Sequence, residues 1–239
     1  MESTGTKFAV AEDTVSGLLL APAAPRAIYV LAHGAGAGMA HPFLGAIAGG
    51  LAERGIATLR YQFPYMELKK RRPDPPAVAE AAVAAAVSEA ARLVPGVPLF
   101  AGGKSFGGRM SSQAAAHGLI PQVRGLAFLG FPLHPPGKPS ATRAEHLASV
   151  SVPMLFLQGS RDDFAELALL EGVVGGLGSR ATLHLIPDAD HSFHVPARSG
   201  RKDADVRVEL LDTLAGWMER LAGGQERRPA RTTPRAPRP

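Results

Sequence analysis

A serine at position 105 stands in a sequence pattern that suits a nucleophile. The segment Gly103-Lys104-Ser105-Phe106-Gly107 matches G-x-S-x-G, which is typical of a sharp turn between a strand and a helix. Such a turn pushes the serine hydroxyl outward and is crowded two residues before and two residues after the serine, where glycine fits best. The helix that follows directs its positive N-terminus at the site and favours developing negative charge. The pattern therefore predicts that Ser105 attacks a carbonyl group.

Two other interpretations of this segment have to be weighed. A phosphate-binding loop, G-x-x-x-x-G-K-[ST], also ends in Gly-Lys-Ser, but it requires a glycine at position 98, where this chain has Pro98. That interpretation is disfavoured. A glycine-rich turn without a chemical role is compatible with the pentapeptide alone, so the prediction depends on partners for Ser105 elsewhere in the chain.

A second glycine-rich segment, from His33 to Gly38, follows an apolar run at 27–32. Glycines let the backbone approach a substrate closely, so this segment suits a loop whose N–H groups hold an oxyanion. The expected donors are the backbone N–H groups of Ala35 and Phe106. A dinucleotide-binding turn is disfavoured, because the glycines form G-x-G-x-G and not G-x-G-x-x-G. His33 is expected to be structural, with its ring bonded to this loop.

Candidate acids follow the apolar run 154–158. Asp162 and Asp163 both lie there, and an acid at this point can hold an imidazole in one tautomer and stabilise its charged form. Spacing alone leaves the choice between the two aspartates open. Asp163 also suits the N-cap of the next helix, which is a purely structural role.

Candidate bases lie in the loop after the apolar run 182–186, which contains His191 and His194. A lone loop histidine is usually a surface residue, so the position after a strand carries the prediction. We expect His191 to be the general base, with His194 as the alternative. Surface positions on helices or strands are expected for the other histidines, His41, His117, His146 and His184.

Short apolar runs that alternate with helical stretches predict the elements that position these residues. Most runs are continuously apolar, as expected for strands covered on both faces. The alternation predicts an α/β fold with a mostly parallel sheet and helices on both faces, in which active sites lie at the carboxyl ends of the strands. The first one or two strands are expected to run antiparallel at an edge. The expected strands span 16–21, 27–32, 57–61, 99–101, 125–129, 154–158 and 182–186, and the expected helices span 42–54, 77–93, 106–117, 143–147, 166–174 and 203–221.

Composition excludes several classes of site. The chain has no cysteine, which excludes disulfides, a thiol nucleophile and thiolate metal ligands. It has no H-E-x-x-H pattern and no carboxylates at ligand spacing, so we expect neither a metal nor a cofactor. It shows no secretory signal and no apolar run of about 18 residues, so we expect a cytoplasmic protein without a membrane partner.

The net charge of +5 is concentrated at one end of the 239-residue chain. Five arginines and one glutamate give residues 223–239 a charge of +4, which leaves +1 for the rest. We therefore expect no nucleic-acid partner for the folded part. The sequence predicts one domain over residues 1–222 and a disordered Pro- and Arg-rich tail over residues 223–239, with weak polyanion binding as the alternative role of the tail. The oligomeric state is not indicated.

Taken together, these motifs resemble the α/β-hydrolase superfamily, and more narrowly its small dienelactone-hydrolase-like members. Two further segments, 61–74 and 131–139, are similar to bacterial relatives of the NSL-complex-subunit-three and testis-expressed hydrolase-like group. The resemblance covers roughly residues 15–221. It rests on His33-Gly34-Ala35-Gly36, Gly103-Lys104-Ser105-Phe106-Gly107-Gly108, Gly159-Ser160-Arg161-Asp162 and Asp190-His191-Ser192-Phe193.

This resemblance implies Ser105 as nucleophile, Asp162 as acid and His191 as base, in the chain order of the superfamily. It favours Asp162 over Asp163, because G-x-x-D is the usual arrangement there. It implies a serine hydrolase that cleaves a small carboxylic ester or thioester through an acyl-enzyme. Dienelactone hydrolases proper use a cysteine, so their substrate is not carried over. The alternative is an inactive interaction or scaffold domain, since eukaryotic members of the narrower group include subunits of chromatin complexes.

The resemblance also implies roles at the rim of the site for further residues, with loop structure and helix capping as the alternative. The 24 residues 130–153, between two expected strands, leave too little chain for a separate lid domain. We therefore expect an open site that prefers short acyl groups. The rim residues are Tyr65, Glu67, Arg72, Asp74, Arg109 and His134.

Overall fold

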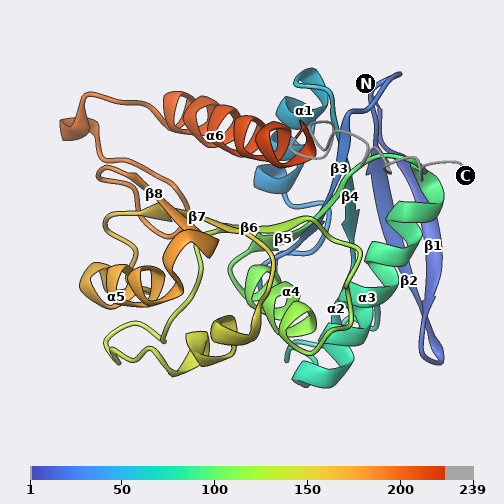
Figure 1. The fold of residues 1–239 in the computed structure, drawn as a ribbon, viewed down its shortest axis with the longest axis horizontal. Coiled ribbons are helices and arrows are strands. Elements are labelled where there is room, and N and C mark those ends of the chain that lie inside the picture. The colour runs from blue at the N-terminus through green and yellow to red at the C-terminus, as the bar shows by residue number, and fades with distance from the viewer. Residues whose placement is uncertain (1, 224–239) are drawn as a thin grey trace, which may run out of the picture.

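An eight-stranded sheet with helices on both faces forms the fold in a computed structural model, which describes residues 2–223 (Figure 1). The strands lie in the order β1-β2-β4-β3-β5-β6-β7-β8. Six of them, β3 to β8, run parallel, whereas β1 and β2 are antiparallel at one edge. The predicted α/β sheet and its antiparallel edge are confirmed.

The strands agree closely with the apolar runs of the sequence. The strands β3 and β6 have the expected bounds, and the other expected strands differ by one to three residues at an end. The edge strand β1 is not expected from the sequence, because its alternating pattern buries only Phe8 and Val10. The bounds are β1 Thr4–Val10, β2 Asp13–Leu20, β3 Ala27–Ala32, β4 Ile56–Tyr61, β5 Leu99–Lys104, β6 Gly125–Leu129, β7 Met154–Gly159 and β8 Ala181–Ile186.

The helices also follow the expected stretches, with two exceptions. The single turn α2 is absent from the sequence prediction, and the stretch expected as a helix at 143–147 is the longer 3₁₀ segment η1. The helix bounds are α1 Pro42–Glu53, α2 Pro64–Glu67, α3 Pro76–Leu93, α4 Phe106–Ala116, α5 Leu167–Leu177 and α6 Asp203–Gly223, with 3₁₀ segments η1 Thr142–Ser149, η2 Gly178–Arg180 and η3 Ala197–Ser199. None of the helices in the described part of the chain combines the length and the apolar character of a membrane span.

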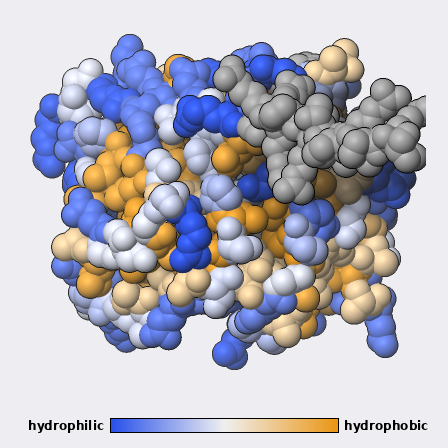
Figure 2. Space-filling model, viewed as in Figure 1, coloured by the Kyte–Doolittle hydropathy of each residue, from blue (hydrophilic) through white to orange (hydrophobic). Residues whose placement is uncertain are grey.

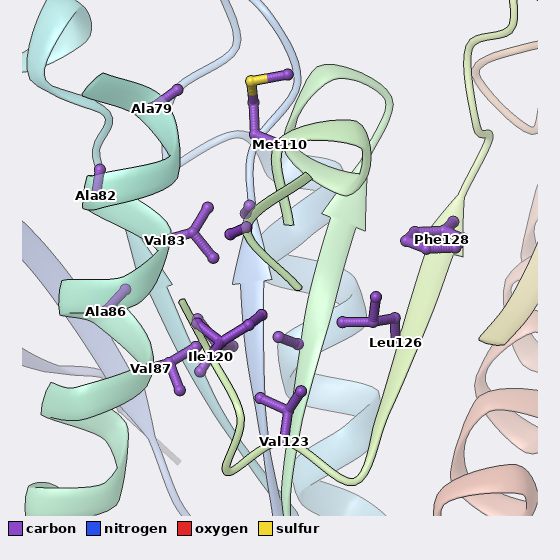
Figure 3. Packing of buried hydrophobic residues seen from close by; sticks show 14 of the residues in the cluster. Ala79, Ala82, Val83, Ala86, Val87, Met110, Ile120, Val123, Leu126 and Phe128 are labelled. Atoms are coloured by element: carbon purple, nitrogen blue, oxygen red, sulfur yellow. The ribbon is translucent and has the colours of Figure 1, made fainter. Parts of the chain in front are cut away.

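Two hydrophobic cores lie on opposite faces of the sheet. Helices α1 and α6 cover one face, and α3, α4 and α5 cover the other (Figure 1). Alanines on α3 bring this helix close to the sheet, and Figure 3 shows Val83 and Val87 directed at the region that holds Ile120 and Val123. Close packing of this kind stabilises the sheet through many small dispersion contacts.

Hydrophobic residues do not form one large exposed area on the face shown in Figure 2, where hydrophilic residues separate them. In residues 2–223 the exposed large hydrophobic side chains are few and lie far apart in the sequence: Leu68, Val78, Leu119 and Val208. Scattered exposure of this kind is normal for a folded surface.

The connection between β6 and β7 contains η1 and otherwise irregular chain. No helix or strand of a separate lid domain occurs within residues 130–153, so the prediction of a fold without a lid is confirmed. The predicted tail begins at Gly223, which is the last residue of α6, and the rest of the tail lies outside the described residues.

The histidine that follows β3 is a structural link between neighbouring strand ends. His33 is completely buried, accepts a hydrogen bond at Nε2 from the Phe63 backbone at 3.2 Å, and donates from Nδ1 to the Gly34 carbonyl at 2.8 Å. The expected bond between this ring and its loop is confirmed. Burial lowers the pKa of His33 to about 4, because the charged imidazolium would lose its water.

This burial predicts a loss of stability in mild acid. The unfolded chain protonates His33 below its ordinary pKa, 6.5, but the folded protein does so only below about 4, so stability falls as the pH falls through this window. We expect His33 to account for about 2 kcal/mol of the decrease in unfolding free energy between pH 7 and pH 5. Urea unfolding at several pH values, for the wild type and His33→Gln, measures this contribution. An equal pH slope in both proteins would contradict the prediction.

Candidate active site

The turn at Ser105 joins β5 to α4 in a strained conformation. Ser105 has φ 49° and ψ −115°, a region that residues with a Cβ atom rarely adopt. An added Cβ at Gly103 would lie 2.2 Å from the Ala32 carbonyl oxygen, and one at Gly107 would lie 2.6 Å from the His33 carbonyl oxygen. Both glycines of the G-x-S-x-G pattern are therefore required, because the turn is pressed against the end of β3.

Three predicted residues from three different loops form one chain of hydrogen bonds. His191 Nε2 lies 2.9 Å from Ser105 Oγ, and His191 Nδ1 lies 2.7 Å from Asp162 Oδ2. A carboxylate only accepts hydrogen bonds, so Nδ1 carries the ring proton and Nε2 is free to accept from the serine hydroxyl. This arrangement can remove a proton from Ser105.

The carboxylate of Asp162 is almost completely buried, with 5% of the residue exposed. Gln158 Nε2 donates to Oδ2 at 2.6 Å, and the Phe164 backbone N–H donates to Oδ1 at 2.8 Å. The other end of the Gln158 amide accepts from the Phe131 backbone N–H at 2.8 Å. These donors satisfy the buried carboxylate and orient it toward His191.

The loop of His191 is organised by Asp190. Its Oδ1 atom accepts from the backbone N–H of Ser192 at 2.8 Å and of His194 at 3.0 Å. The side chain of His194 is exposed and bonds Asp203 through Nδ1 at 2.9 Å, whereas His191 bonds Ser105. The structure therefore brings His191, and not His194, to the serine.

Lys104 contributes to the site although the sequence reasoning missed it. Its Nζ atom donates to the His191 carbonyl oxygen at 2.6 Å and lies 5.5 Å from the centre of the Phe193 ring. Burial lowers the pKa of Lys104 to about 8, and the carboxylates of Asp162 and Asp190 partly oppose this shift. The only sequence signal was its position directly before Ser105, on the strand that leads into the turn.

The residues of the predicted oxyanion donors, Ala35 and Phe106, line one hollow together with Ser105. Tyr65 Oη accepts from the Gly36 backbone N–H at 2.8 Å, which holds the loop after β3 in shape. Within residues 2–223 the backbone N–H groups of Ala35 and Phe106 have no hydrogen-bond acceptor. Both residues line a hollow beside Ser105, so these two donors are free to bind a ligand oxygen.

Two hollows of the surface meet at Ser105, and both include Ala35 and Phe164. The first has a volume of about 310 Å³ and a largely apolar wall with Phe43 and Leu44. The second has a volume of about 190 Å³ and contains Arg109 and Arg143.

Most of the predicted rim residues have structural contacts. Glu67 accepts from the backbone and hydroxyl of Ser16, and Asp74 accepts from the Tyr65 backbone. The His134 ring accepts at Nε2 from the Glu166 backbone N–H at 2.9 Å. Of the six predicted rim residues, Arg109 lines the hollow beside Ser105. The exposed Arg72 makes no side-chain hydrogen bond or ion pair with any residue from 2 to 223 that would explain a role.

Other expectations for polar residues need correction. Asp163 is exposed and does not cap α5, because the N-cap position belongs to Glu166. His146 is half-buried, not a surface residue, and bonds Ser112 Oγ at 2.7 Å. His41 is exposed but lines the larger hollow.

Comparison with solved structures shows the same fold in several hydrolases. A dienelactone hydrolase from Anabaena variabilis matches with a TM-score of 0.75 and 20% identity, over 92% of this chain and 97% of that chain. A serine hydrolase without a lid from Xanthomonas campestris matches with a TM-score of 0.73 and 22% identity, over 90% of this chain and 95% of that chain. The esterase domain of a Rhodothermus marinus protein matches with a TM-score of 0.70 and 16% identity, over 92% of this chain and 99% of that chain.

The family comparison agrees with the fold. The family model described as "Alpha/beta hydrolase domain" matches residues 25–219, which include every strand from β3 to β8 and all three residues of the hydrogen-bonded chain. The narrower resemblance to the NSL-complex-subunit-three and testis-expressed group stays a prediction. The chain belongs to the alpha/beta hydrolase domain family.

Proposed function

We propose that this protein is a serine hydrolase that cleaves a small carboxylic ester or thioester through an acyl-enzyme intermediate. The observation that supports this most strongly is the hydrogen-bonded chain from Ser105 through His191 to Asp162. The strained turn at Ser105 and the two free backbone donors beside it add to the support. A scaffold domain without activity would have no need to keep all of these features together.

Acylation begins when Ser105 Oγ attacks the carbonyl carbon of the substrate. His191 Nε2 takes the hydroxyl proton, and the backbone N–H groups of Ala35 and Phe106 stabilise the oxyanion that forms. The tetrahedral intermediate then collapses, and the leaving alcohol or thiol receives the proton from His191. Asp162 stabilises the imidazolium throughout this step.

Deacylation repeats the same steps with water as the nucleophile. His191 takes a proton from a water molecule, the hydroxide oxygen attacks the acyl carbon, and the bond to Ser105 Oγ breaks. The proton returns to Ser105, and the carboxylic acid leaves. Because Lys104 ties the His191 carbonyl to the strand before the nucleophile, the base keeps its position through both steps.

Substitution of each of the two loop histidines should have very different effects. His191→Ala should lower kcat on a p-nitrophenyl ester by about 10³-fold or more, because loss of one member removes the function of the whole group. His194→Ala should lower kcat by less than about tenfold, since this side chain bonds Asp203 on the exposed side of the loop.

Steady-state hydrolysis by the purified variants measures this difference, with Ser105→Ala as the reference for lost activity. Circular dichroism of both histidine variants excludes unfolding as the cause. A larger loss for His194→Ala than for His191→Ala would refute the assignment of the base.

The open site should also limit the length of the acyl group. The hollows beside Ser105 are open and small, so a long acyl chain would remain in water instead of gaining the roughly 0.8 kcal/mol per CH₂ of a dry groove. We expect kcat/KM on p-nitrophenyl esters to be highest between acetate and butyrate and to fall by octanoate. A rise of about tenfold or more from butyrate to dodecanoate would contradict an open site.

A further inference from the structure

We propose that the preferred substrate is an ester with a carboxylate a few carbons from the scissile carbonyl, and that Arg109 and Arg143 bind this carboxylate beside Ser105. This inference rests on the proposed function, because it specifies the substrate class of the same site. It would make the substrate a half-ester of a short dicarboxylic acid.

The position of the two arginines supports the inference. Arg109 lies on the first turn of α4, and its backbone N–H bonds the Ser105 carbonyl at 3.1 Å. Arg143 comes from η1, in the connection between β6 and β7. Both line the hollow of about 190 Å³ that also contains Ala35, Ser105 and Phe106, so a ligand there lies next to the nucleophile and to both proposed oxyanion donors.

In the described part of the chain, these two arginines differ from the other half-buried arginines because their guanidinium groups have no acceptor. Arg54 and Arg201 form ion pairs with Asp212 and Glu209, and Arg180 donates to the Val150 carbonyl. Within residues 2–223 the guanidinium groups of Arg109 and Arg143 make neither an ion pair nor a hydrogen bond with protein atoms. Both are half-buried, so part of their hydration is already lost.

The charges around this hollow favour an anion. The pKa of Arg109 is lowered first by burial and then by the positive charge of Arg143, which places the two cations within reach of each other. Neither hollow at Ser105 has an aspartate or glutamate in its wall within the described chain. His146 is held by Ser112, and burial together with Arg109 lowers its pKa to about 4, so it is neutral near pH 7. A bound anion would relieve the repulsion between the arginines.

A carboxylate fits both the space and the reaction. Guanidinium groups bind carboxylates through paired, charge-assisted hydrogen bonds. The hollow is small and shares Ala35, Ser105 and Phe164 with the larger apolar hollow, so only a short spacer can separate the anion from the reacting carbonyl. The apolar hollow remains available for the alcohol or thiol that leaves.

The test compares two esters of equal acyl length on the full chain. p-Nitrophenyl hydrogen glutarate carries the carboxylate, and p-nitrophenyl pentanoate replaces it by a methyl group. We expect the wild type to show a kcat/KM at least about tenfold higher for the glutarate ester, and the double variant R109Q/R143Q to lose at least about tenfold of this ratio. Arg220→Gln, which removes an exposed arginine on α6, serves as the matched control and should keep the ratio.

A measurement on the wild type alone covers the case in which the double variant does not fold. Glutarate should inhibit hydrolysis of the neutral ester at a concentration at least about tenfold lower than uncharged glutaramide. If the neutral ester is hydrolysed but the carboxylate gives no preference in either measurement, this inference is wrong and the proposed function stands. If neither ester is hydrolysed, both fail.

Discussion

The close approach of the β5–α4 turn to the end of β3 is the constraint on which the site depends. There is no room for a methyl group at Gly103 or Gly107, and the parallel pairing of Ala32 with Gly103 keeps the two strands at this distance. Under this restraint Ser105 remains in a conformation that an isolated chain would avoid. This strained conformation matters for the chemistry. It directs the Ser105 hydroxyl away from the strand ends, where His191 from another loop can accept its hydrogen bond.

The acid and the base are each held by contacts within their own part of the fold. Asp162 is oriented by Gln158 at the end of β7, and the loop of His191 is shaped by Asp190. The ammonium group of Lys104 then fastens the His191 backbone to β5. The three side chains therefore meet because separate supports fix each of them, which is the kind of preorganisation that acyl transfer requires.

The sequence predicts those features whose pattern is local. Continuous apolar runs define β3 and β6 to the residue, and strand ends followed by glycine, acid or histidine mark the loops that meet at the site. Features that depend on contacts between residues far apart in the sequence have no local pattern from which they could be predicted. Lys104 bonds a carbonyl 87 residues away, and Arg143 lines a hollow together with Ser105 because η1 packs beside α4. Likewise, β1 has too few apolar residues to be recognised before its pairing with β2 is known.

Labelling with a fluorophosphonate tests most directly whether Ser105 is an activated nucleophile. Such a reagent phosphonylates a serine whose hydroxyl has an adjacent general base. We expect peptide mass spectrometry of the labelled protein to find one adduct, on the peptide that contains Ser105, and to find none in Ser105→Ala. An unlabelled wild-type protein, or an adduct on another serine that persists in Ser105→Ala, would contradict this account of the site.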